Sequence, residues 1–216
     1  MFNINDIIKP QKDNFFLIAG PCVVENEENT YTIATQIKNI TDKLKIPFIF
    51  KASYRKANRT RIDSFQGIGD NLALNILSSI RKNLNIPVIT DVHAANEIEY
   101  VIDHIDIIQI PAFLCRQTDI LIQAGKSNKH VNIKKGQFIA AEAMKYAIEK
   151  INSTGNNKII LTERGTMFGY NDLIVDFRNI PIMKTFGYPV IIDITHSVQQ
   201  PNTADGIAGG KPQFIN

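Results

Sequence analysis

Charged side chains that could bind anions recur along this chain, at or just after the ends of short apolar stretches. These cations are Lys51, Lys56, Arg59, Arg116, Lys134 and Arg164. Such a set repels itself unless anions lie among its members, so it predicts ligands with several negative charges. Phosphates and carboxylates suit it best, because Arg offers a two-pronged donor and Lys a compact charge. Any one of these residues alone would be explained as a solvated surface charge.

Cys22, Asp91, His93 and His196 stand at similar positions and offer other chemistry. A Cys thiolate and a His imidazole suit Zn²⁺, Fe²⁺ or a similar metal, although two ligands are too few for a tight site. Nucleophilic catalysis by the Cys–His pair is an alternative, for which no third orienting partner is apparent. Asp91 and His93, two positions apart, could transfer a proton or bind a sugar hydroxyl.

Seven short stretches rich in Ile, Val and Phe precede these polar residues. They are Phe15–Ala19, Phe48–Phe50, Val88–Thr90, Ile107–Ile110, Val131–Ile133, Ile159–Thr162 and Val190–Ile194. Most of them do not alternate between apolar and polar residues, which is typical of strands buried on both faces. The sequence therefore predicts seven parallel strands.

Segments with helical spacing lie between the predicted strands. Their apolar faces are Ile33, Ile37, Ile40 and Leu44 in Tyr31–Lys45; Leu72, Ile76 and Ile80 in Asn71–Leu84; and Met144, Ala147 and Ile151 in Ala141–Ile151. Pro47, Pro87 and Pro189 stand directly before strands, where proline ends a helix and begins an extended segment. Strand–helix alternation of this kind is typical of parallel βαβ units.

Alternation alone fits both a doubly wound sheet and a barrel. A doubly wound sheet concentrates its ligand groups at one switch point and one Gly-rich turn, whereas a barrel collects them from many strand ends. No G-x-G-x-x-G motif follows a strand here, and Gly125-Lys126-Ser127 is no P-loop, because Ile120 stands where the first glycine belongs. The sequence therefore predicts an α/β fold of the (β/α)8 TIM-barrel type, as a single domain over residues 1–216.

Composition narrows the classes of function. The 24 Lys and Arg residues against 21 Asp and Glu residues give a net charge of +3, which is too small for a nucleic-acid binder. Two Cys residues exclude a disulfide framework, and Cys115 is expected to be a buried, inert thiol. No signal peptide is recognisable, and no apolar run reaches the ~20 residues of a membrane helix. We expect a cytoplasmic enzyme or a compact binding domain.

The order of the polar segments resembles that of one enzyme family. The segments are Phe50-Lys51-Ala52-Ser53, Lys56-Ala57-Asn58-Arg59, Thr90-Asp91-Val92-His93, the run from Gln109 to Asp119, Lys134-Lys135-Gly136-Gln137-Phe138, Glu163-Arg164-Gly165 and Phe168-Gly169-Tyr170-Asn171. Together they resemble the 3-deoxy-D-manno-octulosonate 8-phosphate synthases of lipopolysaccharide biosynthesis. The Lys-Ala-Asn-Arg segment discriminates, because the related synthase that uses erythrose 4-phosphate has a Lys-Pro-Arg-Thr type of segment there.

The resemblance implies a barrel enzyme, usually a homotetramer, that condenses phosphoenolpyruvate with D-arabinose 5-phosphate and releases phosphate. In this reaction C3 of phosphoenolpyruvate attacks the sugar aldehyde and water adds at C2. The resulting phosphohemiketal then loses phosphate by C–O cleavage. Holding two anionic substrates in reactive geometry is opposed by entropy, and the cation set would offset that cost.

The resemblance also assigns roles to single residues. The phosphoenolpyruvate contacts are the phosphate ligands Lys134 and Arg164, together with Lys51, Lys56 and Gln109. The sugar-phosphate contacts are Asn58 and Arg59, with Arg116 reaching across a subunit boundary and Asp91 and His93 near the sugar.

A Cys in the first-strand motif marks the metal-dependent class of this family. Cys22 and His196 therefore imply two ligands for Zn, Fe or Mn. In the family a Glu and an Asp from the last part of the barrel complete the ligand set. We expect this chain to lack the eighth βα unit and to bind metal weakly, in keeping with 216 residues where barrels typically have about 250.

One local departure and two alternatives complete the prediction. The chain has Thr60-Arg61 where the family has Ser-Ser, so Arg61 adds a charge beside the sugar-phosphate segment. The first alternative is a catalytically impaired remnant that still binds phosphoenolpyruvate or partner subunits. The second is the related synthase that uses erythrose 4-phosphate, against which the Lys-Ala-Asn-Arg segment argues.

Overall fold

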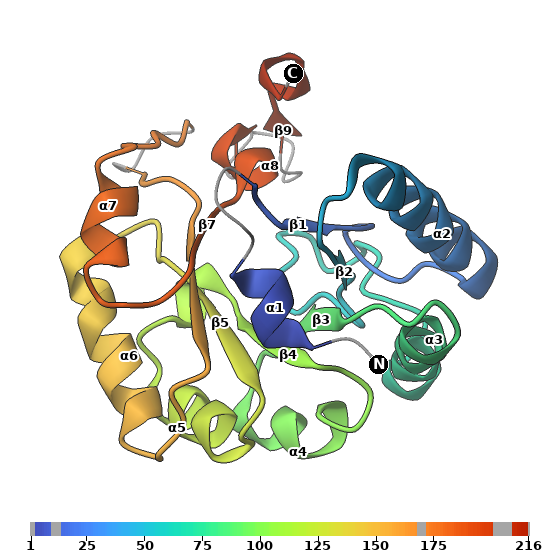
Figure 1. Ribbon diagram of the computed structural model, residues 1–216, viewed down its shortest axis with the longest axis horizontal. Helices are drawn as coiled ribbons and strands as arrows, with labels where there is room; N and C mark the ends of the chain where they lie inside the picture. The colour runs from blue at the N-terminus through green and yellow to red at the C-terminus, as the bar shows by residue number, and fades with distance from the viewer. Residues whose placement is uncertain (1–2, 10–13, 168–171, 201–208, 216) are drawn as a thin grey trace. The chain divides into compact units, whose positions relative to one another are not determined.

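The structure, a computed structural model, describes residues 3–9, 14–167, 172–200 and 209–215. Its main sheet has seven strands in the order β1-β2-β3-β4-β5-β6-β7 (Figure 1). The strands are β1 Leu17–Ala19, β2 Phe48–Lys51, β3 Val88–Asp91, β4 Ile107–Ile110, β5 His130–Lys134, β6 Ile159–Glu163 and β7 Val190–Ile192. All seven predicted strands are confirmed, with ends that differ by at most two residues.

Parallel strands that follow chain order, with helices between them, are the arrangement of a (β/α) barrel. The predicted α/β class of barrel type is confirmed, and, as expected, the seven-stranded sheet has no eighth member within the described ranges. A small antiparallel pair, β8 Gln199–Gln200 and β9 Gly209–Gly210, lies outside this sheet. No helix in the part of the chain that the structure describes is long and apolar enough to cross a bilayer.

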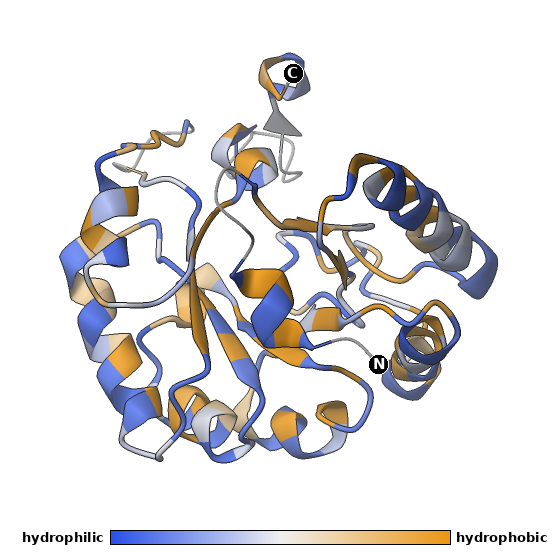
Figure 2. Ribbon diagram, viewed as in Figure 1, coloured by the Kyte–Doolittle hydropathy of each residue, from blue (hydrophilic) through white to orange (hydrophobic). Residues whose placement is uncertain are grey.

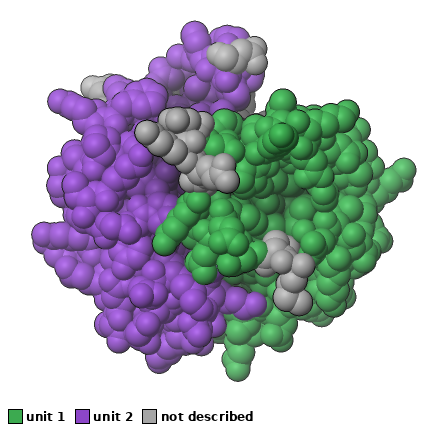
Figure 3. Space-filling view, in the orientation of Figure 1, with its two compact units in different colours: residues 1–58, 65–92, 96–108 green, residues 59–64, 93–95, 109–216 purple. Residues whose placement is uncertain are grey.

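The chain divides into two compact units, coloured separately in Figure 3. Unit 1 consists of Met1–Asn58, Phe65–Val92 and Asn96–Ile108, and unit 2 consists of Arg59–Ser64, His93–Ala95 and Gln109–Asn216. Each unit has its own strands and helices. The single domain over 1–216 stays a prediction.

Unit 1 contains β1 to β3 and four helices, α1 Ile4–Ile8, α2 Glu27–Leu44, α3 Asp70–Asn83 and α4 Ile98–Val101. Helix α2 begins because the side chain of Asn26 accepts a hydrogen bond from the Asn29 backbone at 2.8 Å. It ends at Lys45, whose φ of 55° is left-handed, and Pro47 then starts the extended segment that becomes β2. β1 pairs with β2 and β2 with β3, both in parallel register.

The predicted face of α2 is wrong in its second half. Ile40 and Leu44 are 56% and 62% exposed, and the buried positions are Thr30, Ala34 and Thr41. Small side chains on this stripe let the helix backbone approach β2, which α2 contacts. The spacing of apolar residues therefore predicted the helix correctly, but the face that is buried lies beside the predicted one.

The other two predicted helices show a smaller difference. In α3, Ile76 and Ile80 are buried as expected, but Leu72 is 54% exposed. The predicted helix Ala141–Ile151 is confirmed as a short 3-10 turn, Ala141–Ala143, followed by α6 Met144–Asn152. Figure 2 shows hydrophobic and hydrophilic residues alternating along α6, as expected for a helix that buries one face.

Unit 2 contains β5 to β7, with α5 Thr118–Lys126, α6, α7 Asn179–Lys184 and α8 Ile194–Ser197. Helix α5 packs on α6, and α7 contacts β6 and β7. The 3-10 turns Ala95–Glu97, Ala112–Leu114 and Pro212–Phe214 complete the elements. Parallel register runs from β5 through β6 to β7, so the carboxyl ends of these strands lie at one edge of the sheet.

Candidate functional site

A hydroxyl group links three predicted site residues of unit 1. The Oγ atom of Ser53 accepts hydrogen bonds from Lys51 Nζ and Lys56 Nζ, each at 2.8 Å, and donates one to the Asp91 carboxylate. Lys51 Nζ also lies 3.4 Å from Asp91 Oδ1. Lys51 ends β2 and Asp91 ends β3, so two neighbouring parallel strands bring them together. The structure thus joins Lys51, Lys56 and Asp91, and it adds Ser53, for which the sequence indicated no role.

Burial and charge shape the electrostatics of this group. Burial and the neighbouring charge of Lys51 lower the pKa of Lys56 below its usual range, and Asp91 and Cys22 oppose the shift only in part. The interaction with Cys22 places the thiol near Lys56. Two ammonium groups beside a single carboxylate leave an excess of positive charge that an anionic ligand would neutralise.

Gly20 allows the Gly-Pro-Cys segment to lie against β2. A Cβ atom on Gly20 would lie 2.0 Å from the carbonyl oxygen of Lys51, a distance at which no side chain can be accommodated. The next residues continue this close contact, because Val23 forms an isolated parallel bridge with Ser53. The backbone that carries Cys22 is therefore fixed against the backbone that carries Lys51 and Ser53.

A buried network fixes the segment between Ser53 and Lys56. The fully buried Tyr54 donates its hydroxyl to Glu97, and Glu97 also accepts from Arg55. Arg55 reaches Asp70 as well, at 3.1 Å. Burial raises the pKa of Tyr54, and its hydrogen bond to Glu97 adds to the shift, so the phenol stays a neutral donor.

The sugar-phosphate segment is exposed in this structure. Asn58, Arg59 and Arg116 all have exposed side chains, and their predicted contacts stay predictions. Arg61, the residue that departs from the family pattern, donates two hydrogen bonds to Asp63 at 2.9 and 2.6 Å. Its additional charge is therefore paired locally. His93, placed in unit 2, is partly buried.

The second group of predicted site residues, in unit 2, is centred on a carboxylate that the sequence did not indicate. Asp193 Oδ2 lies 2.5 Å from Lys134 Nζ and 2.8 Å from His196 Nδ1. Asp193 also caps α8, because its Oδ1 accepts the backbone N–H of His196 at 2.9 Å. A signal that could have identified it is the position of Asp193 three residues before His196, which is the spacing of an N-cap residue and the backbone N–H that it accepts.

The charges of this group stabilise an ionised Asp193 and a neutral His196. Burial alone would raise the pKa of Asp193, but the hydrogen bond from His196 and the charge of Lys134 outweigh burial and hold the pKa well below its usual range. The hydrogen bond to Asp193 raises the pKa of His196, whereas burial and the charges of Lys134 and Arg164 lower it, with a net decrease. A neutral imidazole that donates from Nδ1 to a carboxylate leaves the Nε2 lone pair free to bind a metal.

Arg164 follows β6 and is 4% exposed. Its Nη2 atom donates to Gln199 Oε1 at 3.1 Å. Burial lowers the pKa of Arg164, opposed by Asp193 and Glu163. The charge of Lys134 lowers the pKa of Asp193, and the charge of Asp193 in turn raises that of Arg164, so these three residues form one electrostatic group; binding of one phosphate by Lys134 and Arg164 stays a prediction.

A chain of hydrogen-bonded, buried amide and hydroxyl groups crosses β4, β5 and β6. Gln109 Nε2 donates to Asn132 Oδ1 at 2.8 Å, and Asn132 Nδ2 donates to Thr162 Oγ1 at 2.7 Å. Asn132 and Lys134 lie two residues apart on β5 and so share one face of the sheet. The predicted site residue Gln109 is thus fixed by its neighbours, and Asn132 and Thr162 were missed by the sequence argument.

Two of the predicted residues have side-chain chemistry that suits a ligand of a metal ion. Cys22 has an exposed thiol, and His196 has the carboxylate partner on Nδ1 that metal-binding histidines usually have. Within the described ranges, no group of three or more His, Cys, Asp or Glu residues could hold a metal ion. Cys22 and His196 belong to different units, and their joint role as ligands stays a prediction.

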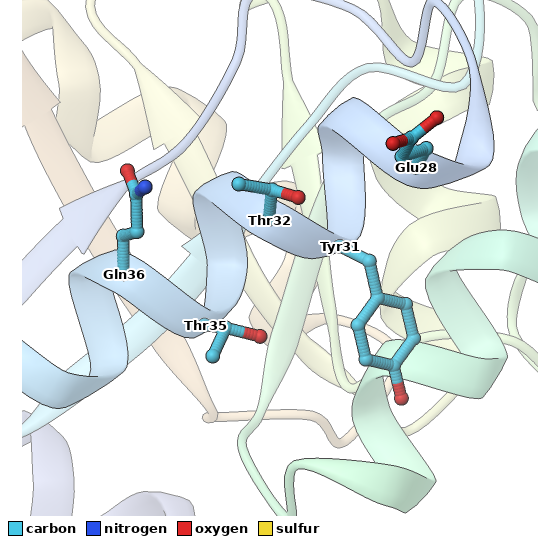
Figure 4. A pocket seen from close by; sticks show the side chains of 5 residues that line it. All are labelled: Glu28, Tyr31, Thr32, Thr35 and Gln36. Atoms are coloured by element: carbon cyan, nitrogen blue, oxygen red, sulfur yellow. The ribbon is translucent and has the colours of Figure 1, made fainter.

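The described surface also has a shallow groove, of about 360 Å³, on α2. It is lined by Glu28, Tyr31, Thr32, Thr35 and Gln36, whose side chains Figure 4 shows along this helix. None of the predicted site residues lines it. The Phe168–Asn171 motif lies outside the described residues.

One group of cations is linked by the Ser53 hydroxyl to Asp91, and the other is organised around the Asp193 carboxylate. Cations at strand ends are expected of an enzyme that binds anions at the carboxyl edge of a parallel sheet. The chain matches the model of the DAHP synthetase I family over residues 1–213, and it belongs to this family.

Relatives within this family carry a more specific name. The chain is 53% identical over 199 residues to a 2-dehydro-3-deoxyphosphooctonate aldolase of Desulfatibacillum aliphaticivorans, covering 92% of this chain and 73% of the relative. It is 52% identical over 203 residues to the protein of that name from Koribacter versatilis, covering 93% and 73%. For the protein of that name from Bartonella henselae, identity is 46% over 212 residues, covering 98% and 76%. The family resemblance drawn from the polar segments is thereby confirmed.

Proposed function

We propose that this chain condenses phosphoenolpyruvate with D-arabinose 5-phosphate and water to give 3-deoxy-D-manno-octulosonate 8-phosphate and inorganic phosphate. The observation that carries the proposal is the agreement between its relatives, named 2-dehydro-3-deoxyphosphooctonate aldolases at 46–53% identity, and the polar segments at its strand ends. The two cation groups support it, because both substrates are anions.

The proposed roles are those that the family resemblance implies for these residues. In unit 2, Lys134 and Arg164 bind the phosphate of phosphoenolpyruvate and Gln109 lines the site. In unit 1, Lys51 and Lys56 bind its remaining anionic groups, and Asp91 lies near the sugar. His93 lies near the sugar as well, and Asn58, Arg59 and Arg116 contact the sugar phosphate.

The bond changes balance without an oxidant or a reductant. The π electrons of the C2=C3 bond of phosphoenolpyruvate form the new bond from C3 to the aldehyde carbon, whose oxygen takes up a proton and becomes a hydroxyl. Water adds its hydroxyl at C2 and gives up the proton that balances this step. The C2–O bond to phosphate then breaks as the C2 hydroxyl becomes a ketone, and its proton leaves with the phosphate. The lysine and arginine side chains hold both anions in place and stabilise the negative charge that develops on the aldehyde oxygen.

We also propose that Cys22 and His196 would act as two ligands of a divalent metal ion, Zn, Fe or Mn. When bound, such an ion would polarise an oxygen atom of the substrate as a Lewis acid. The residues of this chain prepare for it by keeping His196 neutral and oriented through Asp193. We also propose a cytoplasmic homotetramer, in which Arg116 reaches the sugar phosphate of a neighbouring subunit.

Release of inorganic phosphate from phosphoenolpyruvate tests the proposed reaction. The purified chain is assayed with D-arabinose 5-phosphate and, separately, with D-erythrose 4-phosphate, with and without added Mn²⁺ or Zn²⁺. Phosphate release that depends on the five-carbon sugar supports the proposal. Preference for erythrose 4-phosphate would instead identify the related synthase, and phosphoenolpyruvate binding without turnover would identify an impaired remnant.

A further inference from the structure

Two oppositely charged side chains that the proposed reaction does not use lie wholly inside unit 2. Lys135 Nζ is 3.4 Å from Glu163 Oε1, and both side chains are 0% exposed. Lys135 directly follows Lys134, and Glu163 directly precedes Arg164. The buried pair therefore adjoins in sequence both proposed ligands of the phosphate.

Glu163 fixes the backbone that carries Arg164. Its Oε1 atom accepts the backbone N–H of Arg164 at 3.0 Å and that of Gly165 at 2.7 Å. Gly165 has a φ of 93°, a left-handed conformation that glycine adopts without strain. Two charge-assisted hydrogen bonds at this turn determine the direction in which the chain leaves β6 and so the position of Arg164.

Lys135 ties the two segments that follow β5 and β6 to each other. Its ammonium group donates to Thr166 Oγ1 at 3.0 Å, to the carbonyl oxygens of Gly136 and Ile139 at 3.4 Å each, and to that of Gly165 at 3.5 Å. Burial lowers the pKa of Lys135, and the charge of Glu163 opposes that shift. The partner carboxylate therefore helps to keep this buried amine protonated, so that its three N–H groups are shared among these oxygens.

A fully buried ion pair carries a large desolvation penalty. Removing two charges from water is strongly unfavourable, and apolar side chains of similar volume often stabilise a fold as well or better. Glu163 Oε2 has no hydrogen-bond partner in the described part of the chain, so the carboxylate is not optimised for stability alone. Its contacts are concentrated on the turn that presents Arg164.

We propose that Lys135 and Glu163 are positioning residues for phosphoenolpyruvate, which hold Lys134 and Arg164 at the spacing that one phosphate group requires. The identity of the ligand rests on the proposed function, whereas the positioning of the Arg164–Gly165 backbone is independent of it. Loss of the pair leaves both phosphate ligands in the chain but no longer fixes their separation.

Glu163→Ala and Glu163→Gln separate the contribution of Glu163 as a hydrogen-bond acceptor from the contribution of its negative charge. Gln retains an acceptor for the two backbone N–H groups, whereas Ala removes it. We expect the Gly165 amide to exchange with solvent about tenfold faster in Glu163→Ala than in the wild type, and close to the wild-type rate in Glu163→Gln. Glu142→Gln, at an exposed position of the same unit, is the matched control. Unchanged exchange in Glu163→Ala would overturn the positioning role.

Calorimetry with phosphoenolpyruvate, well below the unfolding temperature, supplies the second readout. We expect Glu163→Ala to bind on the order of tenfold more weakly, the loss of one charge-assisted contact, and Glu142→Gln to bind like the wild type. Wild-type affinity in folded Glu163→Ala would overturn the proposal. Failure of the wild type to bind phosphoenolpyruvate would count against the proposed function, while the exchange measurement still decides the positioning role.

The double variant Lys135→Met/Glu163→Gln covers the case in which Glu163→Ala fails to fold. It leaves no unpaired buried charge, so we expect its melting temperature to stay near that of the wild type. The double variant lacks the hydrogen bonds from Lys135 to the Gly165 carbonyl oxygen and to Thr166 Oγ1, which hold this turn in place. We therefore expect faster exchange of the backbone amides of residues 165 and 166 and weaker binding of phosphoenolpyruvate. A stable double variant with wild-type exchange and affinity would show that the pair only fills space.

Discussion

The Oδ2 atom of Asp193 lies 2.5 Å from the Nζ atom of Lys134. The same oxygen lies 2.8 Å from Nδ1 of His196. One carboxylate therefore connects a proposed ligand of the substrate phosphate with a proposed ligand of the metal. Because Asp193 also caps the helix that carries His196, the orientation of the imidazole and the charge of the lysine depend on the same side chain.

Asp193→Asn is expected to weaken metal binding by the chain. Asn can no longer accept the Nδ1 proton of His196 as a charged partner, and loss of such a partner typically reduces metal affinity about 10- to 100-fold. Titration with Co²⁺ or Zn²⁺, followed by absorbance or calorimetry, measures the effect. Asp119→Asn, at an exposed position of α5, is the control. Equal affinity in Asp193→Asn and the wild type would contradict the proposed role of His196 as a ligand.

Lys134→Met is expected to reduce the affinity for phosphoenolpyruvate. A hydrogen bond to a charged group contributes about 1.5–3 kcal/mol, which corresponds to a loss of roughly 10- to 150-fold. Lys145→Met removes an exposed lysine of the same unit and should leave the affinity unchanged, so that a general effect of net charge is excluded. Calorimetric titration gives both constants, and similar values for the two variants would remove Lys134 from the site.

The sequence predicted the strands and the charged residues at their ends because both depend on local composition. Buried strands need runs such as Ile107–Ile110 and Ile159–Thr162, and a parallel sheet then places the residues after those runs at one edge. The faces of the helices were less predictable. Ile40 and Leu44 are exposed, although their spacing predicted that they lie on the buried face of the helix. The space beside β2 is filled instead by the smaller side chains of Ala34 and Thr41.

The supporting polar residues could not be predicted for a different reason. Ser53, Asn132 and Asp193 each act through a partner that is distant in the sequence: Asp91, Gln109 and Lys134, respectively. A sequence shows which side chains can donate or accept, but the pairing is decided by strand register. Asn132, a polar residue inside the otherwise apolar stretch Val131–Ile133, was the clearest signal, since a buried amide requires partners.

Asn132→Ala is expected to destabilise unit 2 without removing a charge. It leaves Gln109 Nε2 and Thr162 Oγ1 without their buried partner, and each unsatisfied buried group costs about 1–3 kcal/mol. Urea unfolding monitored by circular dichroism measures the free energy of unfolding. Asn157→Ala, at an exposed position, should change it by less than about 0.5 kcal/mol. A neutral result for Asn132→Ala would mean that the amide chain contributes nothing to stability.

The two cysteines are expected to react with iodoacetamide at very different rates. Cys22 is exposed, whereas Cys115 is fully buried, and burial raises the pKa of the Cys115 thiol. Because the thiolate is the nucleophile, a raised pKa keeps Cys115 protonated at neutral pH, and its labelling should increase only as the pH rises above the usual range of thiols. Mass spectrometry of Cys22→Ser isolates Cys115. Fast labelling of Cys115 at pH 7 would contradict this, and protection of Cys22 by Zn²⁺ would support its role as a ligand.

Gly20→Ala is expected to be among the most damaging single changes outside the charged groups. Its Cβ atom would lie 2.0 Å from the Lys51 carbonyl oxygen, so either the Gly-Pro-Cys segment or the end of β2 must move. Overpacking of this kind typically costs about 1–3 kcal/mol, and the displaced Lys51 should also weaken phosphoenolpyruvate binding. Gly187→Ala separates the two contributions, because Gly187 has a φ of 83° but open space around it, so only the conformational cost applies there. If both variants lose the same stability and bind phosphoenolpyruvate equally, the contact between Gly20 and Lys51 does not position the lysine.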